Sequence, residues 1–124
     1  MDSNVPIYLQ ISQFIEDEII SNRLAAEDKV PSTNDFSKSM NVNPATAGKG
    51  LNELVDQGIL YKKRGLGMFV TADAKAIILR KRKEFFAKQL LPNFLNEAKQ
   101  LNITKKELIE MIGSDDNAWT EKCN

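Results

Sequence analysis

A short polar and basic run near the middle of the chain, NPATAGKG, offers side chains that can bind another molecule. Thr46 has a hydroxyl that can donate to a base edge or a phosphate, and a methyl group that can contact thymine. Lys49 follows at helical spacing and adds a positive charge on the same face. Arg64 ends the basic run KKR and can pair with phosphates or enter a narrow minor groove. These side chains suit contact with nucleic acid.

Side chains that usually carry catalysis or bind metals are scarce. The sequence has no histidine, and its single cysteine, Cys123, lies next to the last residue. We therefore predict no imidazole base, no metal site and no disulfide framework. The G-x-G of residues 65–67 lacks the third glycine, the Lys-Ser/Thr pair and the following helix of a phosphate loop. Without a recognisable pair of spaced carboxylates, we predict that the protein is not an enzyme and uses no cofactor.

The charges balance overall but are unevenly distributed. Residues 1–72 hold seven basic and nine acidic residues, residues 73–101 hold seven and three, and residues 102–124 hold three and five, for net charges of −2, +4 and −2. A neutral total therefore permits a local basic face. No apolar run approaches about 18 residues and the start lacks a signal-peptide pattern, which predicts a cytoplasmic protein.

Two helices are predicted in the first 40 residues. An apolar stripe at helical spacing predicts a core-packing helix over residues 6–22. The stripe comprises Ile7, Ile11, Phe14, Ile15 and Ile19. Ser32, with Asp35 three positions later, predicts a capping box at the start of a short second helix. Asn41 suits the left-handed turn after that helix, and Val42 would fill the corner.

A third helix is predicted over residues 44–57, with Asn43 as its N-cap and Pro44 as its first residue. One face is apolar, and the opposite face is small, polar and mildly basic: Ala45, Thr46, Gly48, Lys49 and Asn52. Two short helices joined by about three turn residues predict a helix-turn-helix. Gly48 and Gly50 each cost about 1 kcal/mol relative to alanine in a helix, so we expect them to let its first turns fit a groove.

Residues 59–70 predict a β-hairpin with RGLG at its tip. Ile59 and Tyr61, and then Met68 and Val70, offer the alternation of two strands, and the glycines between them are hairpin signals. Three helices followed by a hairpin make a winged helix-turn-helix, so we predict a mainly α fold with a small β-hairpin and place this domain at residues 1–72. The basic tip would contact phosphates or a minor groove, and a solvated charged turn is the alternative.

In order and spacing, three segments resemble the DNA-binding domain of GntR-family bacterial transcription regulators: PIYLQISQFIEDEIISNRL, VPSTNDFSKSMNVNPATAGKGLNELVDQGIL and YKKRGLGMFV. The resemblance covers residues 5–71. It implies DNA contacts at the start of the second helix, the first half of the third helix and the wing tip. The implied residues are Ser32, Asn34, Asn43, Pro44, Ala45, Thr46, Gly48, Lys49, Arg64 and Gly65. Asn34 stands where the family usually has arginine, and Gly48 stands where a long polar or basic residue is common. The resemblance therefore predicts the mode of DNA binding better than it predicts the operator sequence.

The sequence of residues 73–112 predicts a helical region through which two chains dimerise. The stretch 73–101 has about two apolar residues per turn, a wider stripe than the short helix predicted after Thr104 can cover. We therefore expect a two-fold homodimer, with Pro92 kinking the long helix. The expected dimer contacts are Phe86, Leu90, Leu91, Phe94, Leu95, Ala98 and Leu101.

Two further segments are charged or polar. The run RKRK at residues 80–83 is a nucleic-acid patch or, as we favour, the solvated start of the long helix. Residues 113–124 predict a disordered tail in which Trp119 has no evident anchor.

A short two-helix appendage resembles that of the YtrA-type subgroup of GntR regulators, often associated with transporter operons. Its length implies dimerisation, with no room to enclose a ligand pocket of the usual several hundred Å³. We predict a DNA-binding transcriptional repressor that binds an inverted-repeat operator as a homodimer, with no small-molecule effector assigned. A winged helix that only contacts other proteins is the alternative.

Overall fold

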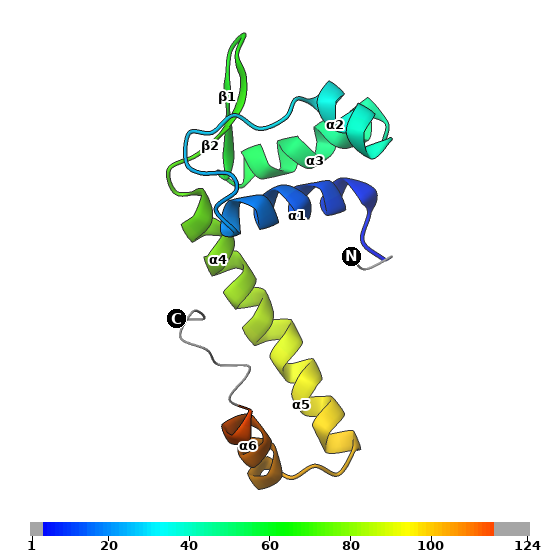
Figure 1. Ribbon diagram of the computed structural model, residues 1–124. Coiled ribbons are helices and arrows are strands. Elements are labelled where there is room, and N and C mark those ends of the chain that lie inside the picture. Colours follow the sequence, from blue (N-terminus) through cyan, green and yellow to red (C-terminus); the bar gives the residue numbers. More distant parts are fainter. Residues whose placement is uncertain (1–3, 116–124) are drawn as a thin grey trace. The chain divides into compact units, whose positions relative to one another are not determined.

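The computed structural model describes residues 4–115. Its elements follow in the order α1 (Ile7–Ile20), α2 (Thr33–Met40), α3 (Pro44–Asp56), β1 (Leu60–Lys63), β2 (Gly67–Val70), α4 (Ala74–Phe85), a π-helical turn η1 (Phe86–Leu90), α5 (Leu91–Gln100) and α6 (Lys105–Ser114) (Figure 1). The fold is mainly helical with one antiparallel hairpin among the described residues, as predicted. Residues 116–124, which include Trp119 and Cys123, lie outside the described range.

The chain forms two compact units that divide after Arg82. The first unit extends past residue 72, where the sequence indicated the end of the winged helix, because the first turns of α4 pack into its core. Ala74 and Ile78 are both buried there. The stretch predicted as one helix over residues 73–101 consists of α4, η1 and α5 in succession.

The buried face of α1 is rotated relative to the predicted stripe. Ile11, Ile15 and Ile19 are buried as expected. Ile7 and Phe14 are instead 56% and 41% exposed, because the buried face extends from the isoleucines toward Ser12 and Glu16 on the opposite side. The Phe14 ring still meets Phe36 of α2 edge to face, with 6.1 Å between ring centroids.

The predicted start and end signals of α2 are confirmed. The Ser32 hydroxyl accepts a hydrogen bond from the Asp35 backbone N–H at 3.0 Å. The Asp35 carboxylate accepts in return from the Ser32 N–H at 3.2 Å, which completes the capping box. Asn41 ends the helix in the left-handed conformation, with φ 54° and ψ 47°.

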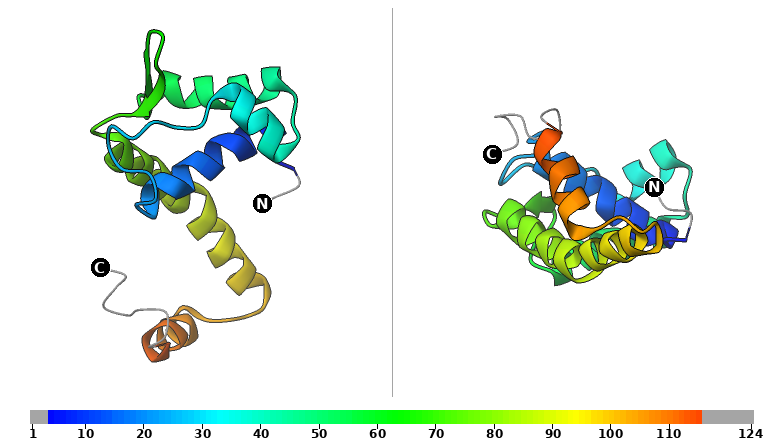
Figure 2. Two further views of the ribbon diagram at one scale, coloured as in Figure 1. Left: turned by 45° about the horizontal axis from the view of Figure 1, so that its top comes forward. Right: turned by 90° about the horizontal axis from the view of Figure 1, so that it is seen from below.

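α3 begins and ends where the sequence predicts. The Asn43 side chain accepts the Ala45 N–H at 2.7 Å, and Pro44 opens the first turn. Gly58, with φ +79°, follows Gln57 at the C-terminal end. The helices α1 and α3 lie side by side (Figure 2). Gly50 is buried where they pack together. The prediction that Gly50 helps α3 to fit a groove of another molecule is therefore wrong.

The hairpin pairs Leu60 with Val70 and Lys63 with Gly67. Leu60 and Val70 are buried, whereas Tyr61 is half exposed. Ile59 is also buried, but it lies in the bend before β1, so the alternation of the strand itself begins at Leu60.

On the opposite face of the hairpin, Tyr61 packs against Phe69, with 6.1 Å between ring centroids. The far edge of β2 is paired with residues 27–30: Val30 donates to the Met68 carbonyl and Val70 donates to the Asp28 carbonyl, each at 3.0 Å. The base of the wing is therefore held from both sides.

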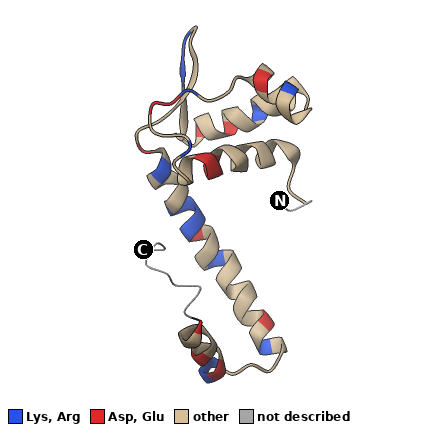
Figure 3. Cartoon of the chain, in the orientation of Figure 1, with Lys and Arg blue, Asp and Glu red and all other residues tan. Residues whose placement is uncertain are grey.

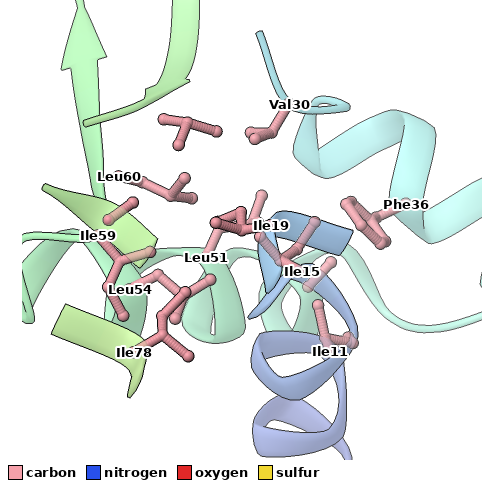
Figure 4. Packing of buried hydrophobic residues seen from close by; sticks show 13 residues of the cluster. Ile11, Ile15, Ile19, Val30, Phe36, Leu51, Leu54, Ile59, Leu60 and Ile78 are labelled. Carbon is pink, nitrogen blue, oxygen red and sulfur yellow. The ribbon is translucent and has the colours of Figure 1, made fainter. Parts of the chain in front are cut away.

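One apolar core joins the three helices, the hairpin and the start of α4 (Figure 4). Leu51 and Leu54 of α3 are buried at its centre together with Ile15 of α1. Ile59 and Ile78 close the side toward α4. Because α3 contributes its whole apolar face to this core, its opposite face is left for solvent or a partner.

The second unit contains the helices after Arg82. The π-helical turn η1 ends two residues before Pro92, in a helical run that continues without a break into α5, and such a turn can accommodate the missing N–H of the proline. A capping box between Thr104 and Glu107 starts α6, as predicted. Ala98 is buried, and its carbonyl accepts the Ile103 N–H at 2.9 Å in the turn between α5 and α6.

Candidate nucleic-acid interface

The first turns of α2 and α3 lie close together in the first unit. A Cβ placed on Gly48 would be 3.8 Å from Cγ2 of Thr33, so the small face of α3 looks toward the start of α2. Ser32 is committed to the capping box, and Asn34 beside it is exposed. Two of the three segments predicted to contact DNA are therefore adjacent.

The N-terminal half of α3 presents small and polar side chains outward. Asn43 and Pro44 shape the start of the helix, because the amide of Asn43 is used as its cap. Ala45 is exposed, Thr46 is half exposed, and the backbone at Gly48 is accessible. A groove of nucleic acid could approach this surface closely, because no long side chain stands before Lys49.

Lys49 is exposed and makes a contact that sequence reasoning missed. Its Nζ lies 4.1 Å from the centroid of the Tyr8 ring on α1, within the range of a cation–π interaction. Tyr8 therefore aligns the lysine along the edge of the exposed face of α3. The sequence does show an aromatic residue, Tyr8, in the first turn of α1. Local periodicity, however, does not indicate that Tyr8 contacts Lys49.

The wing tip carries Arg64 and Gly65, and both are exposed. Gly65 has φ +77° and an open space around its missing Cβ, as the tight turn requires. Lys63 lies below the tip with Nζ 4.4 Å from the Phe69 ring centroid. Leu66, which the sequence analysis did not select, is 61% exposed beside the basic residues. Figure 3 shows basic residues along this hairpin.

A surface groove of about 400 Å³ connects the wing to the start of α2. Its lining includes Ser32, Thr33 and Asn34 at the start of α2, and Leu66 and Gly67 of the wing. Lys29 also lines it, where its Cε would lie 3.0 Å from a Cβ on Gly67. The first unit therefore brings the wing next to α2, although these segments are more than 30 residues apart in the sequence.

Two residues of the basic run at 80–83 are engaged inside the first unit. Lys81 and Arg82 both pair with Glu16 of α1, which is 3% exposed. This pairing does not fit either sequence interpretation, a nucleic-acid patch or a purely solvated face. Sequence reasoning missed it because Glu16 looked like a solvated residue between apolar positions.

Two pKa shifts in the first unit reflect hydrogen bonds that hold the local structure. Bonding to the Ser32 side chain and then to its backbone N–H lowers the pKa of Asp35. The hydrogen bond from the Tyr61 hydroxyl to the Glu27 carboxylate raises the pKa of Tyr61. Each shift moves the pKa of its group further from neutral pH.

Within residues 4–115 no group of three or more Asp, Glu, His or Cys side chains could hold a metal ion. No helix in the described part of the chain is long and apolar enough to cross a membrane. This surface offers hydrogen-bonding groups and cations around a small-faced helix, and such groups contact the backbone and bases of nucleic acids.

A family model described as "Bacterial regulatory proteins, gntR family" matches residues 7–70, from the start of α1 to the end of β2. The chain belongs to this family. It is a DNA-binding transcriptional regulator with the winged helix of gntR proteins, and the matched region contains every residue that we predicted to contact DNA.

Similarity to gntR relatives extends beyond the matched domain. Over 110 residues the chain is 34% identical to the uncharacterized HTH-type transcriptional regulator YhcF of Bacillus subtilis, with 89% of each chain covered. It is 28% identical to the HTH-type transcriptional repressor YtrA of the same species, over 89% of this chain and 84% of YtrA. The match to YtrA beyond the winged helix is consistent with the YtrA-like subgroup.

Solved structures give the same picture. A GntR family transcriptional regulator from Listeria monocytogenes is 34% identical and superposes with a TM-score of 0.72, covering 91% of this chain and 97% of that chain. The DNA-binding domain of AraR, solved in complex with operator ORR3, is 30% identical with a TM-score of 0.54 and covers 57% of this chain and 86% of that one.

Proposed function

We propose that this gntR regulator is a repressor that binds an inverted-repeat operator as a homodimer. Each subunit would read one half-site through the start of α2, the first half of α3 and the wing. The observation that carries the proposal is the groove that brings Asn34 and Thr33 next to the wing residue Leu66, beside the open face of α3. Such an arrangement lets a helix enter the major groove while the wing follows the backbone.

Individual roles follow from the chemistry of the exposed groups. Thr46 contacts a base edge or a thymine methyl group from the first turns of α3. Lys49, aligned by Tyr8, neutralises a phosphate at the rim of the groove. Arg64 reaches the minor groove or its phosphates from the wing tip. Asn34, in place of a longer basic residue, contributes a weaker hydrogen bond that carries no charge.

Ser32, Asn43, Pro44, Ala45, Gly48 and Gly65 have a different part in this proposal. They shape the backbone or keep it accessible, so that N–H groups and short side chains can approach the phosphates. The caps at Ser32 and Asn43 fix where α2 and α3 begin. Substituting these residues would therefore change the position of the recognition elements as well as their contacts.

Dimerisation is supported by the apolar surface of the second unit. Six of the seven residues predicted to form the interface are exposed in the single chain: Phe86, Leu90, Leu91, Phe94, Leu95 and Leu101. Soluble monomers rarely expose such a contiguous set, and a second copy of the chain is the simplest partner that covers it. The seventh residue, Ala98, is buried by its own chain where α5 turns toward α6.

The test is selection of DNA fragments by the purified full-length chain, followed by gel shifts over a range of salt concentrations. We expect a two-fold symmetric motif with half-site centres about one helical turn, or a multiple, apart. Affinity should fall steeply with salt, as phosphate contacts require. Recovery of an asymmetric motif, or binding by a single chain, would overturn the dimer model.

A lacZ reporter driven by the selected site should be repressed when the protein is expressed, and activation would refute the repressor assignment.

A further inference from the structure

The first turn of α1 contacts α3 beside the face proposed to meet DNA. The two helices run side by side and start at the same end of the first unit (Figure 1). Tyr8 of α1 is half-buried, Lys49 of α3 is exposed, and the lysine Nζ lies 4.1 Å from the centroid of the Tyr8 ring. The ammonium therefore lies over an aromatic face that belongs to an element outside the helix-turn-helix and the wing.

The backbone at Tyr8 is fixed on α3. Its carbonyl oxygen packs against Gly50, where no side chain intervenes. The Ser12 hydroxyl, one turn further along α1, lies 3.3 Å from the Tyr8 carbonyl oxygen and also donates to the Gly50 carbonyl. Because Gly50 directly follows Lys49, the ring and the lysine extend from two backbones that are held together.

Lys49 has no other polar partner in the described part of the chain. Its side chain forms no ion pair and no hydrogen bond within residues 4–115, whereas Lys81 and Lys88 are each paired with a carboxylate. An ion pair of that kind would have to break before a phosphate could bind. A cation–π contact leaves the positive charge in place, because the ring attracts the ammonium through its quadrupole and does not neutralise it.

A lysine that is already ordered binds a phosphate at a lower entropic cost than a free one. A long side chain loses rotamer freedom when it pairs with a charged group. Tyr8 restricts Lys49 before DNA arrives, so part of this loss occurs during folding and not during binding. The ring also limits the places that Nζ can occupy, and phosphate contacts of fixed position set the register of a protein on the duplex.

We propose that the first turn of α1 is part of the DNA interface, with Tyr8 as a positioning residue that holds the Lys49 ammonium for one backbone phosphate in each half-site. This inference rests on the proposed function, in which Lys49 contacts DNA. Tyr8 acts through the lysine and not by touching the operator.

Three substitutions separate the ring from its surroundings. Tyr8→Leu removes the ring and keeps an apolar side chain. Tyr8→Phe keeps the ring and removes a hydroxyl that makes no hydrogen bond within the described residues. Ile7→Ala is the matched control, because Ile7 lies in the same turn of α1 and is 56% exposed.

The first measurement is the affinity of the full-length variants for the selected operator. Tyr8→Leu should bind about twofold to fivefold more weakly than wild type, the range for an exposed cation–π contact. Tyr8→Phe and Ile7→Ala should bind like wild type. In a Lys49→Ala background, Tyr8→Leu should cause no further loss, because the ring then has no ammonium to hold. A role of Tyr8 in general stability would instead give the same loss in both backgrounds.

The second measurement identifies the phosphate. Operators are made with one methylphosphonate linkage, which is uncharged, at each backbone position in turn. One position should weaken binding by wild type and leave Lys49→Ala unaffected, and it marks the phosphate that Lys49 contacts. At this position the loss in Tyr8→Leu should be smaller than in wild type, and the loss in Tyr8→Phe should equal that of wild type.

Wild-type affinity in folded Tyr8→Leu would overturn the inference, and so would a loss of the same size in the Lys49→Ala background. If Tyr8→Phe bound as weakly as Tyr8→Leu, the hydroxyl and not the ring would be responsible, and the role of the ring would be refuted. Tyr8→Met replaces Tyr8→Leu, with the same expected results, if the leucine variant melts below the assay temperature.

Those outcomes would leave the proposed function standing. Absence of specific DNA binding by wild type, or wild-type affinity in Lys49→Ala, would refute the proposed DNA contact of Lys49 and this inference with it.

Discussion

Ser12 donates a buried hydrogen bond of 2.7 Å to the backbone carbonyl of Gly50, where α1 packs against α3. The backbones come this close because Gly50 has no side chain. A Cβ there would lie 2.5 Å from the Tyr8 carbonyl oxygen and 3.1 Å from Ile11 Cβ. In this gntR protein α3 therefore packs directly against the backbone of α1 at Gly50.

Gly50→Ala should destabilise the first unit by about 1–3 kcal/mol, because the new methyl group overpacks this contact. Gly48→Ala is the matched control, since a Cβ there meets its nearest atom at 3.8 Å, an ordinary contact distance. It should stabilise the protein by about 0.5–1 kcal/mol through helix propensity. Urea unfolding of both variants measures the difference, and equal effects would contradict the close packing of α1 on α3.

The capping box of α2 should make stability depend on pH in the acid range. Bonding to Ser32 lowers the pKa of Asp35 from its ordinary value of 3.8. Ionised Asp35 therefore stabilises the folded state above that value, and this contribution is lost as pH falls through the lowered pKa of the folded state.

Ser32→Ala should reduce stability near neutral pH by about 1 kcal/mol and weaken the loss of stability in acid, because the cap and the pKa shift disappear together. Ser39→Ala, at an exposed serine of the same helix, should not reduce stability near neutral pH and should leave the acid dependence unchanged. Thermal melts from neutral pH to below the ordinary Asp pKa provide the comparison. If Ser32→Ala kept the acid dependence of the wild type, another carboxylate would be responsible.

Leu90→Asp should convert the proposed homodimer into a monomer. Leu90 is 49% exposed in the single chain, and a charge at this position would be buried unpaired in the proposed interface. Gln89→Asp adds the same charge at the neighbouring exposed residue and should leave the dimer intact. Light scattering at micromolar concentration should give twice the 14.0 kDa chain mass for wild type and the control. A monomeric wild type would contradict the dimer assignment.

Local signals in the sequence predicted the ends of the helices well. These signals act on backbone groups only two or three residues away, so their effects follow from local chemistry. They are the pair Ser32 and Asp35, the pair Asn43 and Pro44, and the left-handed Asn41. The order of helices and hairpin followed from these signals and from the apolar periodicity.

Contacts between distant residues could not be predicted in the same way. Glu16 sits in a local pattern that favours solvent, and its burial depends on Lys81 and Arg82, 65 and 66 residues later. Gly50 looked like a residue for an external groove because the sequence does not reveal which face meets α1. The candidate site was predicted as three separate segments. The tertiary structure was needed to show that a groove joins the start of α2 to the wing residues Leu66 and Gly67, and that Gly48 of α3 faces Thr33.

Thr46→Val should relax base preference at one position of each half-site. The substitution keeps the shape of the side chain and removes the hydroxyl, which would cost about 1–3 kcal/mol of discrimination if it contacts a base edge. A repeat of the DNA selection with the variant measures this change in base preference directly. The salt dependence of binding should stay the same because no charge is lost. An unchanged motif would exclude Thr46 from base recognition.

The salt dependence of operator affinity tests most directly whether α3 and the wing contact DNA. We would compare wild type with the double variant Lys49→Ala, Arg64→Ala, and with Lys105→Ala, Lys106→Ala as a charge-matched control on α6. The first double variant should bind more weakly and lower the slope of log affinity against log salt by about two phosphate contacts per subunit. The control should match wild type. If the Lys49 and Arg64 double variant kept the wild-type affinity and slope, the interface proposed here would be wrong.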